Sequence, residues 1–227
     1  MADILRLPGE FPDRALYKFY KKLEYAVAFA ECGQFRMGLL GYYRDIEDHV
    51  RSDSSEGFGH IQRREEIDVG YFTVGKPDEF EVRQELAFMH HRSVMGNPIF
   101  IFSTSQEGVD IGAMRERFGR YVVCIENPVQ LAQDITAHLA CGPATFGAGV
   151  EGRIIQYNQG EVLDEELEGW DFIAMSYRQK PSNFGIEKEF RYIAINTNEH
   201  EHRIQCDYIE IDLGGPLEYL TLIHPDE

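Results

Sequence analysis

The chain contains little cysteine, and none of it is arranged for metal binding. Its 227 residues include four cysteines, with no C-x-x-C pair: Cys32, Cys124, Cys141 and Cys206. Thiolate ligands of structural zinc sites usually come in close pairs, so we expect no metal site of this kind. Scattered cysteines are typical of a reducing compartment, and we therefore expect a cytoplasmic protein.

Long apolar runs and two common catalytic motifs are also missing. The N-terminus lacks a basic region followed by an apolar core, so no signal peptide is expected. No window approaches the ~18 apolar residues of a membrane helix. There is no G-x-x-x-x-G-K-[ST] phosphate-binding loop and no G-x-S-x-G nucleophile turn. The sequence therefore predicts neither a P-loop protein nor a serine hydrolase of that type.

Positive charge is scarce. Lysine and arginine number 22 against 39 aspartates and glutamates, a net charge of −17. Such a surface repels phosphate at long range, which argues against a general nucleic-acid coat protein or a protein that binds anionic membranes. An RNA or DNA substrate met through a local basic patch stays open. Hydrophobic residues make up 43% of the chain, enough for a sizeable core, and we expect one domain over residues 1–227.

Sequence periodicity predicts more strands than helices. Helices are expected at 21–32, ended by Gly33, and at 111–118 and 129–139. The expected strands are 15–20, 34–37, 98–105, 120–126, 152–158, 171–177, 188–196, 203–213 and 218–223, with a hairpin of two longer strands at about 60–74 and 79–89. This order predicts an α+β fold with a mostly antiparallel sheet.

Two glutamates near position 188 are the first candidates for chemistry. Glu187 and Glu189 lie two residues apart at the start of an apolar run. On one strand both carboxylates would share a face, with Cα atoms about 6–7 Å apart, and like charges this close raise one pKa. Such a pair can stabilise an oxocarbenium-like centre and activate a nucleophile. The alternative is a solvent-facing strand whose acids pair with Lys188 or Arg191.

Two further segments carry polar groups that suit a ligand. The strand at 98–105 ends in Ser103, Thr104 and Ser105, whose hydroxyls either serve a pocket at the sheet edge or cap the next turn. The first strand places Lys18 among aromatic residues. An ammonium group beside a ring suits a phosphate and a stacked base, and the alternative is a lysine that extends along the sheet edge.

In this order, the three segments resemble the Arg-Ser-Glu class of ADP-ribosyltransferases. The chain is also similar to a large, poorly characterised bacterial family found among toxin–antitoxin and phage-defence genes. The matching motifs are Leu16-Tyr17-Lys18-Phe19, Phe102-Ser103, the strand 119–125, and Glu187-Lys188-Glu189-Phe190-Arg191. The similarity runs from about residue 16 to 195 and rests on short motifs. It implies an ADP-ribosyltransferase-like fold, with a split, mostly antiparallel sheet and flanking helices.

The resemblance assigns catalytic roles residue by residue. Glu189 would be the catalytic glutamate that orients the ribose hydroxyl and stabilises the oxocarbenium. Glu187 would position or deprotonate the acceptor. Ser103, followed by Thr104, would support the nicotinamide ribose and the glutamate.

The resemblance also implies a basic part of the cofactor site. Tyr17 or Lys18 would occupy the place of the family's first-strand arginine, with Arg44 and Arg191 as the other basic residues. Here the chain departs from the family pattern, because a lysine lacks the bidentate fork of arginine.

These roles imply an NAD-dependent ADP-ribosyltransferase for which NAD is a substrate. The acceptor would be a macromolecule (protein, RNA or DNA), and the protein would be a toxin or phage-defence effector neutralised by an antitoxin or chaperone. Two alternatives remain. One is a binding module that kept the fold and lost the chemistry, which the first-strand lysine favours. The other is an NAD glycohydrolase, which would use the same pocket without an acceptor.

Overall fold

The computed structural model describes residues 7–40, 58–72, 80–94, 99–142, 149–158, 162–163, 177–196 and 207–225. The elements in chain order are β1 (Leu16–Tyr20), α1 (Leu23–Cys32), β2 (Gln34–Leu39), β3 (Phe58–Phe72), β4 (Phe80–Val94), β5 (Ile99–Gln106), α3 (Ile111–Phe118), β6 (Tyr121–Ile125), α4 (Pro128–Ala140), β7 (Glu151–Ile154), β8 (Val162–Leu163), the 3₁₀ helix η1 (Ser182–Glu187), β9 (Glu189–Ile195), β10 (Tyr208–Asp212) and β11 (Leu220–Ile223). The fold is α+β, as the sequence predicts.

The three expected helices are present, and local sequence explains where they begin and end. Helix α1 ends at Gly33, whose φ of 67° is left-handed and whose amide bonds back to the last helical turn. Helix α4 begins with Pro128, and the Asn127 side chain accepts a hydrogen bond from the Gln130 amide. The Asp110 side chain caps α3 in the same way.

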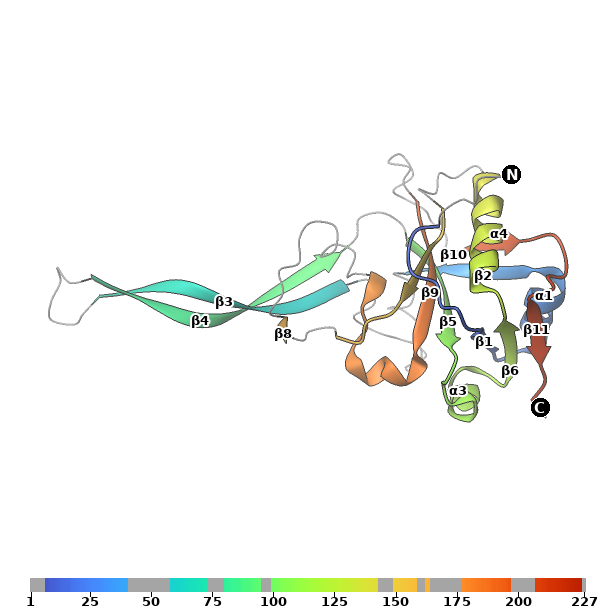
Figure 1. The fold of residues 1–227 in the computed structure, drawn as a ribbon, viewed down its shortest axis with the longest axis horizontal. Helices are drawn as coiled ribbons and strands as arrows, with labels where there is room; N and C mark the ends of the chain where they lie inside the picture. Colours follow the sequence, from blue (N-terminus) through green and yellow to red (C-terminus); the bar gives the residue numbers. More distant parts are fainter. Residues whose placement is uncertain are drawn as a thin grey trace.

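The main sheet has eight strands, all paired antiparallel, and it divides at β5. On one edge of β5, β9 pairs along residues 99–105. On the other edge, β2 reaches residues 100–101 and β1 reaches residues 105–106. Within the described chain, residues 102–104 have no strand partner on that second edge. The sheet therefore opens into two wings, one formed by β1, β6 and β11 and the other by β2 and β10 (Figure 1).

The largest apolar core lies on the face of the sheet that α1 and α4 cover. Phe102 of β5 is at its centre, with ring centroids 5.3 Å from Phe29, 4.5 Å from Phe35 and 6.0 Å from Tyr192. On the opposite face, one small cluster surrounds Ile101, and another packs beneath α3. Between these two clusters the sheet presents polar side chains, which form the cleft described below.

The expected hairpin is also present, as two 15-residue strands, β3 and β4, whose turn residues lie outside the described part. Figure 1 shows it extending away from the main sheet, with the short β8 parallel to β3. Among the described residues, no helix is both long and apolar enough to cross a membrane.

Some expected strands differ from the observed ones. The strand predicted at 152–158 ends at Ile154. Of the strand predicted at 203–213, β10 covers Tyr208–Asp212, and residues 203–206 lie outside the described part. Of the strand predicted at 171–177, residues 171–176 lie outside the described part, and Tyr177 is helical rather than extended. The 3₁₀ helix η1 is not predicted, because its six residues, which follow Pro181 and include asparagine and glycine, have no helical period.

Replacing Phe102 with alanine tests the importance of the aromatic centre of the core. The side chain is 2% exposed, and deleting a buried phenylalanine typically costs about 3–5 kcal/mol of unfolding free energy. Denaturant unfolding of the variant measures this loss. Leu23→Ala is the control, because that side chain is 41% exposed and surface changes usually stay within about 0.5 kcal/mol. Equal losses for both variants would contradict the assignment of Phe102 to the centre of the core.

Candidate functional site

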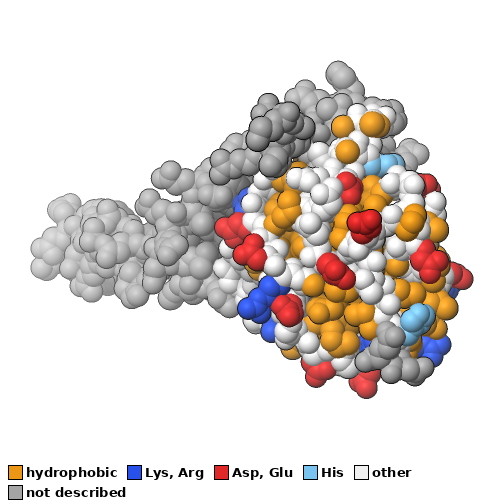
Figure 2. Space-filling model, turned by 45° about the vertical axis from the view of Figure 1, so that its right-hand side comes forward, with side chains coloured by type: hydrophobic (Ala, Val, Ile, Leu, Met, Phe, Trp, Pro, Cys, Tyr) orange, Lys and Arg blue, Asp and Glu red, His pale blue; other side chains and the backbone are white. Residues whose placement is uncertain are grey.

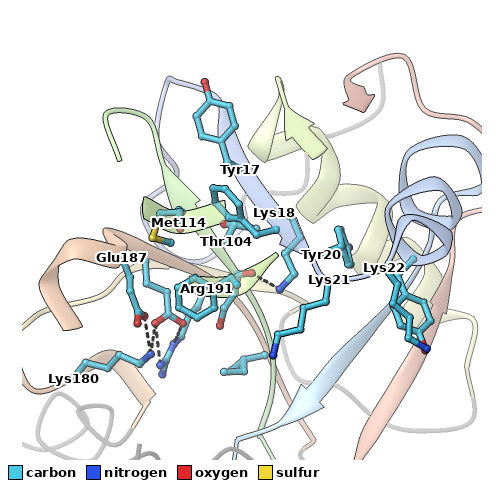
Figure 3. A pocket seen from close by; sticks show the side chains of 17 residues that line it. Tyr17, Lys18, Tyr20, Lys21, Lys22, Thr104, Met114, Lys180, Glu187 and Arg191 are labelled. Atoms are coloured by element: carbon cyan, nitrogen blue, oxygen red, sulfur yellow. Dashed lines mark hydrogen bonds and ion pairs between the residues drawn. The ribbon is translucent and has the colours of Figure 1, made fainter. Parts of the chain in front are cut away.

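A cleft of about 430 Å³ lies over β1, β5 and β9, next to the opening of the sheet (Figure 3). Helix α3 contributes to one side of it, and η1 with the preceding segment contributes to another. The residues that line it are Tyr17, Lys18, Phe19, Tyr20, Lys21, Lys22, Tyr25, Ile101, Ser103, Thr104, Ser105, Met114, Phe118, Lys180, Glu187, Glu189 and Arg191.

Strand register brings the predicted polar residues together. Ser105 of β5 lies opposite Tyr17 of β1 on one side and opposite Glu189 of β9 on the other. Ser103 lies opposite Arg191. Directly paired residues of a sheet share a face, so three adjacent strands aim these side chains into the same cleft.

The two glutamates do not lie on one strand, so the period-2 geometry predicted for them is wrong. Glu187 is the last residue of η1, Lys188 is left-handed with φ of 41°, and Glu189 is the first residue of β9. The unusual backbone is held in place: the Lys188 carbonyl accepts from the Gln106 amide at 2.9 Å, and its ammonium group donates to the Gly108 carbonyl at 2.7 Å. The two carboxylates nevertheless lie close together, because both contact the same third side chain.

That side chain is Lys180, at the centre of a buried cluster of charges (Figure 3). Its Nζ lies 3.1 Å from Oε2 of Glu187 and 2.8 Å from Oε2 of Glu189. Arg117 of α3 approaches the other oxygen of Glu187 at 3.2 Å. Arg191 Nε donates to Oε1 of Glu189 at 2.7 Å. The side chains of Lys180 and the two glutamates are 9% exposed or less.

The surroundings push the pKa values of the two carboxyls in opposite directions. Burial alone would raise the pKa of Glu189, but the charges and hydrogen bonds of Arg191 and Lys180 outweigh it and hold that pKa well below the ordinary 4.5. For Glu187, burial dominates and raises the pKa above 4.5, with Lys180 opposing the shift and Glu189 adding to it. Glu189 is therefore ionised at neutral pH, and on acidification Glu187 takes up a proton before Glu189 does.

Arg191 and Tyr157 fix the position of Glu189. The Arg191 side chain is fully buried, and it also donates to the Tyr177 carbonyl at 3.1 Å. The Glu189 amide donates to the Tyr157 hydroxyl at 2.6 Å, and burial raises the pKa of that hydroxyl, so it stays protonated. The structure thus places Arg191 beneath the acidic pair, as the partner of Glu189.

The other predicted residues have different positions. Lys18 donates to the Ser103 carbonyl at 2.6 Å and lies 4.6 Å from the centre of the Phe102 ring, so its ammonium group occupies the opening of the sheet. The Thr104 hydroxyl donates to a backbone carbonyl of β9 at 3.1 Å. The Tyr17 ring extends away from the ion cluster (Figure 3). Arg44 lies outside the described residues.

Sequence reasoning misses Lys180 and Arg117. Lys180 precedes Pro181 in a segment without a periodic pattern, and only the tertiary fold brings it between two acids. Arg117 lies in the last turn of α3 and resembles any basic residue near a helix end. The Lys21-Lys22 pair directly after the first strand also lines the cleft. Two adjacent lysines in an acidic chain are a sequence signal that could have identified this part of the site.

The charge of the cleft is opposite to that of the chain. Five lysine or arginine side chains and two glutamates line it, a formal excess of three positive charges, in a chain whose net charge is −17. Figure 2 shows acidic side chains spread over one face of the main body. The cleft is therefore a local place where an anionic ligand is favoured.

One glycine motif matches a dinucleotide-binding fingerprint in spacing but not in context. Gly147, Gly149 and Gly152 follow the G-x-G-x-x-G pattern. The fingerprint needs a strand before the glycines and a helix after them, whereas here they follow α4 and lead into β7. Gly152 has a packing reason instead, because a Cβ there would lie 2.5 Å from the Phe11 ring.

Comparisons of the chain with protein-family models, with curated proteins and with solved structures found no match. Among the described residues, no group of three or more histidine, cysteine, aspartate or glutamate side chains could hold a metal ion. The cysteines there are free, and Cys32 and Cys141 are exposed.

Substituting Glu189 with glutamine should destabilise the protein at neutral pH by about 3–5 kcal/mol, because it leaves buried cations without their anion. The stability that Glu189 contributes is present above pH 4.5, its ordinary pKa, and is lost as the pH falls through the lowered folded value. The difference in unfolding free energy between the parent and the variant should therefore become smaller below pH 4.5. Urea unfolding at several pH values measures it.

Glu187→Gln is the matched comparison, with the opposite sign. Its folded pKa is raised, so the stability contributed by the titrating carboxyl is present below pH 4.5 and lost as the pH rises through the folded value. On acidification the parent should gain stability relative to this variant. If both parent–variant differences in unfolding free energy changed in the same direction with pH, the pKa values of the two carboxyls would not be shifted in opposite directions.

Proposed function

We propose that this protein is an NAD-dependent ADP-ribosyltransferase that binds NAD in the cleft and transfers ADP-ribose to a macromolecule. The observation that carries the proposal is the placement of Ser103, Ser105 and Glu189 on neighbouring strands, on one wall of a basic cleft at the opening of the sheet. The motif order that suggests the family at the sequence level is thus matched by proximity in space.

The cleft suits a dinucleotide in size and charge. Its volume of about 430 Å³ falls within the range of small-molecule sites, roughly 300–1,000 Å³. Lys18, Lys21 and Lys22 supply positive charge for a diphosphate, and the Tyr25 and Phe118 rings supply apolar surface for a base or nicotinamide. NAD carries both kinds of group.

The two carboxyls are suited to different steps. When the bond between ribose C1′ and nicotinamide breaks, its electron pair leaves with nicotinamide and positive charge develops on the ribose. An anion fixed nearby stabilises that charge, and Glu189 stays ionised. The acceptor then bonds to C1′ and gives up a proton, and Glu187, with its raised pKa, is the group to take it. In many enzymes, two titratable groups whose environments shift their pKa values apart take different acid–base roles.

A specific observation favours a second candidate, a binding module without catalysis. Both oxygens of Glu189 are already bonded, Oε1 to Arg191 and Oε2 to Lys180. These cations reduce the field that the carboxylate can exert on a ribose. Lys18 is likewise engaged with the Ser103 carbonyl. On this reading the cleft holds an anionic ligand and leaves it intact.

The biological setting follows from the resemblance and belongs to the same proposal. The acceptor is a cellular protein, RNA or DNA met in the cytoplasm, and the protein acts as a toxin or phage-defence effector. An effector that consumes NAD inside the cell that makes it needs a neutralising partner, an antitoxin or a chaperone.

Incubation with NAD and cell extract, followed by mass spectrometry, tests the activity. We expect release of nicotinamide together with a macromolecule that has gained ADP-ribose. Glu189→Gln should lower turnover by on the order of 10²–10³, the usual effect of removing one preorganised electrostatic contact. Because that variant also disturbs buried charges, Ser103→Ala provides a milder change on the same wall of the cleft, and it too should slow turnover.

Glu210→Gln is the control for these variants. Glu210 is also a strand glutamate paired with an arginine, Arg36, but it is exposed and does not line the cleft. Its turnover should equal that of the parent, and thermal melting reports whether each variant is folded. Free ADP-ribose without a modified acceptor would support the glycohydrolase instead. A folded parent that binds NAD without cleaving it would support the binding module.

A further inference from the structure

Lys180 contacts both carboxylates of the cleft, although it belongs to neither η1 nor β9. Two hydrogen bonds tie the backbone at Arg178 and Lys180 to Gln156. The Lys180 amide donates to the Gln156 carbonyl at 2.9 Å, and the Gln156 amide donates to the Arg178 carbonyl at 2.9 Å. The next residue is Pro181, which restricts Lys180 to extended conformations. The ammonium group also lies 5.0 Å from the centre of the Phe184 ring of η1.

We infer that Lys180 is the positioning residue of the cleft, and that its single ammonium group holds the carboxylates of Glu187 and Glu189 at a fixed separation. Regular strand geometry does not set this separation, because a left-handed residue lies between the end of η1 and the start of β9. Arg117 contacts Glu187 and Arg191 contacts Glu189. Lys180 contacts both, at 3.1 and 2.8 Å.

The charges around Glu187 show what this bridge does for protonation. Glu187 faces Lys180 from the preceding segment, Arg117 from α3 and Glu189 from β9, and it also feels Tyr157. Two of these groups are cations that favour the ionised carboxyl, whereas Glu189 and burial disfavour it. Without Lys180, one cation is lost and the repulsion between the two acids is unshielded. Glu187 should then keep its proton to a higher pH.

The catalytic consequence rests on the proposed function. If ionised Glu187 accepts the proton of the acceptor, the rate of transfer rises with pH as Glu187 ionises. Losing Lys180 should move that rise to higher pH. A merely structural role for Lys180 would lower the amount of active protein and leave the midpoint of the profile unchanged.

The test is an NMR titration that needs neither NAD nor activity. The protein is labelled with ¹³C at glutamate δ carbons, and the Glu187 signal is assigned as the one that Glu187→Gln removes. Lys180→Met should shift the Glu187 midpoint to higher pH than in the parent. Lys180→Arg, which keeps the charge, should return it toward the parent value.

Lys188→Met is the matched control. Lys188 lies next to both glutamates in sequence, but its ammonium group is exposed and donates to the Gly108 carbonyl instead. The hydrogen bond from the Gln106 amide to the Lys188 carbonyl is a main-chain bond and remains in this variant. Loss of the ammonium group changes the net charge by the same amount and should leave the Glu187 midpoint in place. If Lys180→Met does not fold, Lys180→Gln replaces it, because glutamine keeps a hydrogen-bond donor without the charge.

The outcomes separate this inference from the proposed function. A Glu187 midpoint that stays at the parent value without Lys180, or that moves equally in Lys188→Met, overturns the positioning role even if NAD is turned over. A midpoint that rises without Lys180 and returns with arginine supports the role even if NAD is not a substrate. With turnover present, the pH–rate profile of Lys180→Met should move in the same direction.

Discussion

The site depends on one buried network of charges, in which Lys180 and Arg191 enclose Glu189 while Lys180 and Arg117 enclose Glu187. Removing charges from water is costly, and it is tolerated only when each charge is paired and hydrogen-bonded. Here the pairing joins α3 to the continuous stretch that runs from Lys180 through η1 into β9, which is distant from α3 in sequence. The same contacts shift the pKa values of the two carboxyls in opposite directions. A substitution that alters this ion pairing therefore changes both the stability of the fold and the protonation of the site.

The opening of the sheet explains why a cleft exists beside this network. Because β1 and β2 pair with different ends of β5, the middle of β5 lacks a strand neighbour on that edge within the described chain. Lys18 bonds to the Ser103 carbonyl at this gap, and Phe102 supports it from the core. A positively lined cleft in a chain of net charge −17 concentrates anions at one place. This contrast agrees equally with a dinucleotide substrate and with an anionic ligand that is bound and left intact.

Sequence alone predicts the elements whose signals are local. Gly33, Pro128 and the alternating strands of the hairpin lie where turn chemistry and period require. Ser105 and Glu189 meet because their strands pair, and their sequence motifs identify both segments in advance. The left-handed Lys188 is not predictable, since its conformation is held by contacts to Gln106 and Gly108 far away in the chain. Lys180 escapes prediction for the same reason: its role comes from two acids that only the tertiary fold brings to it.

The most direct test of the central claim is a crystal structure of the protein with a non-hydrolysable NAD analogue. The account predicts that the analogue occupies the cleft over β1, β5 and β9, with its diphosphate near the lysines that follow β1. The nicotinamide ribose should lie within hydrogen-bond reach of Glu189 or Ser103. An analogue bound elsewhere, or an empty cleft at saturating analogue, would contradict the account.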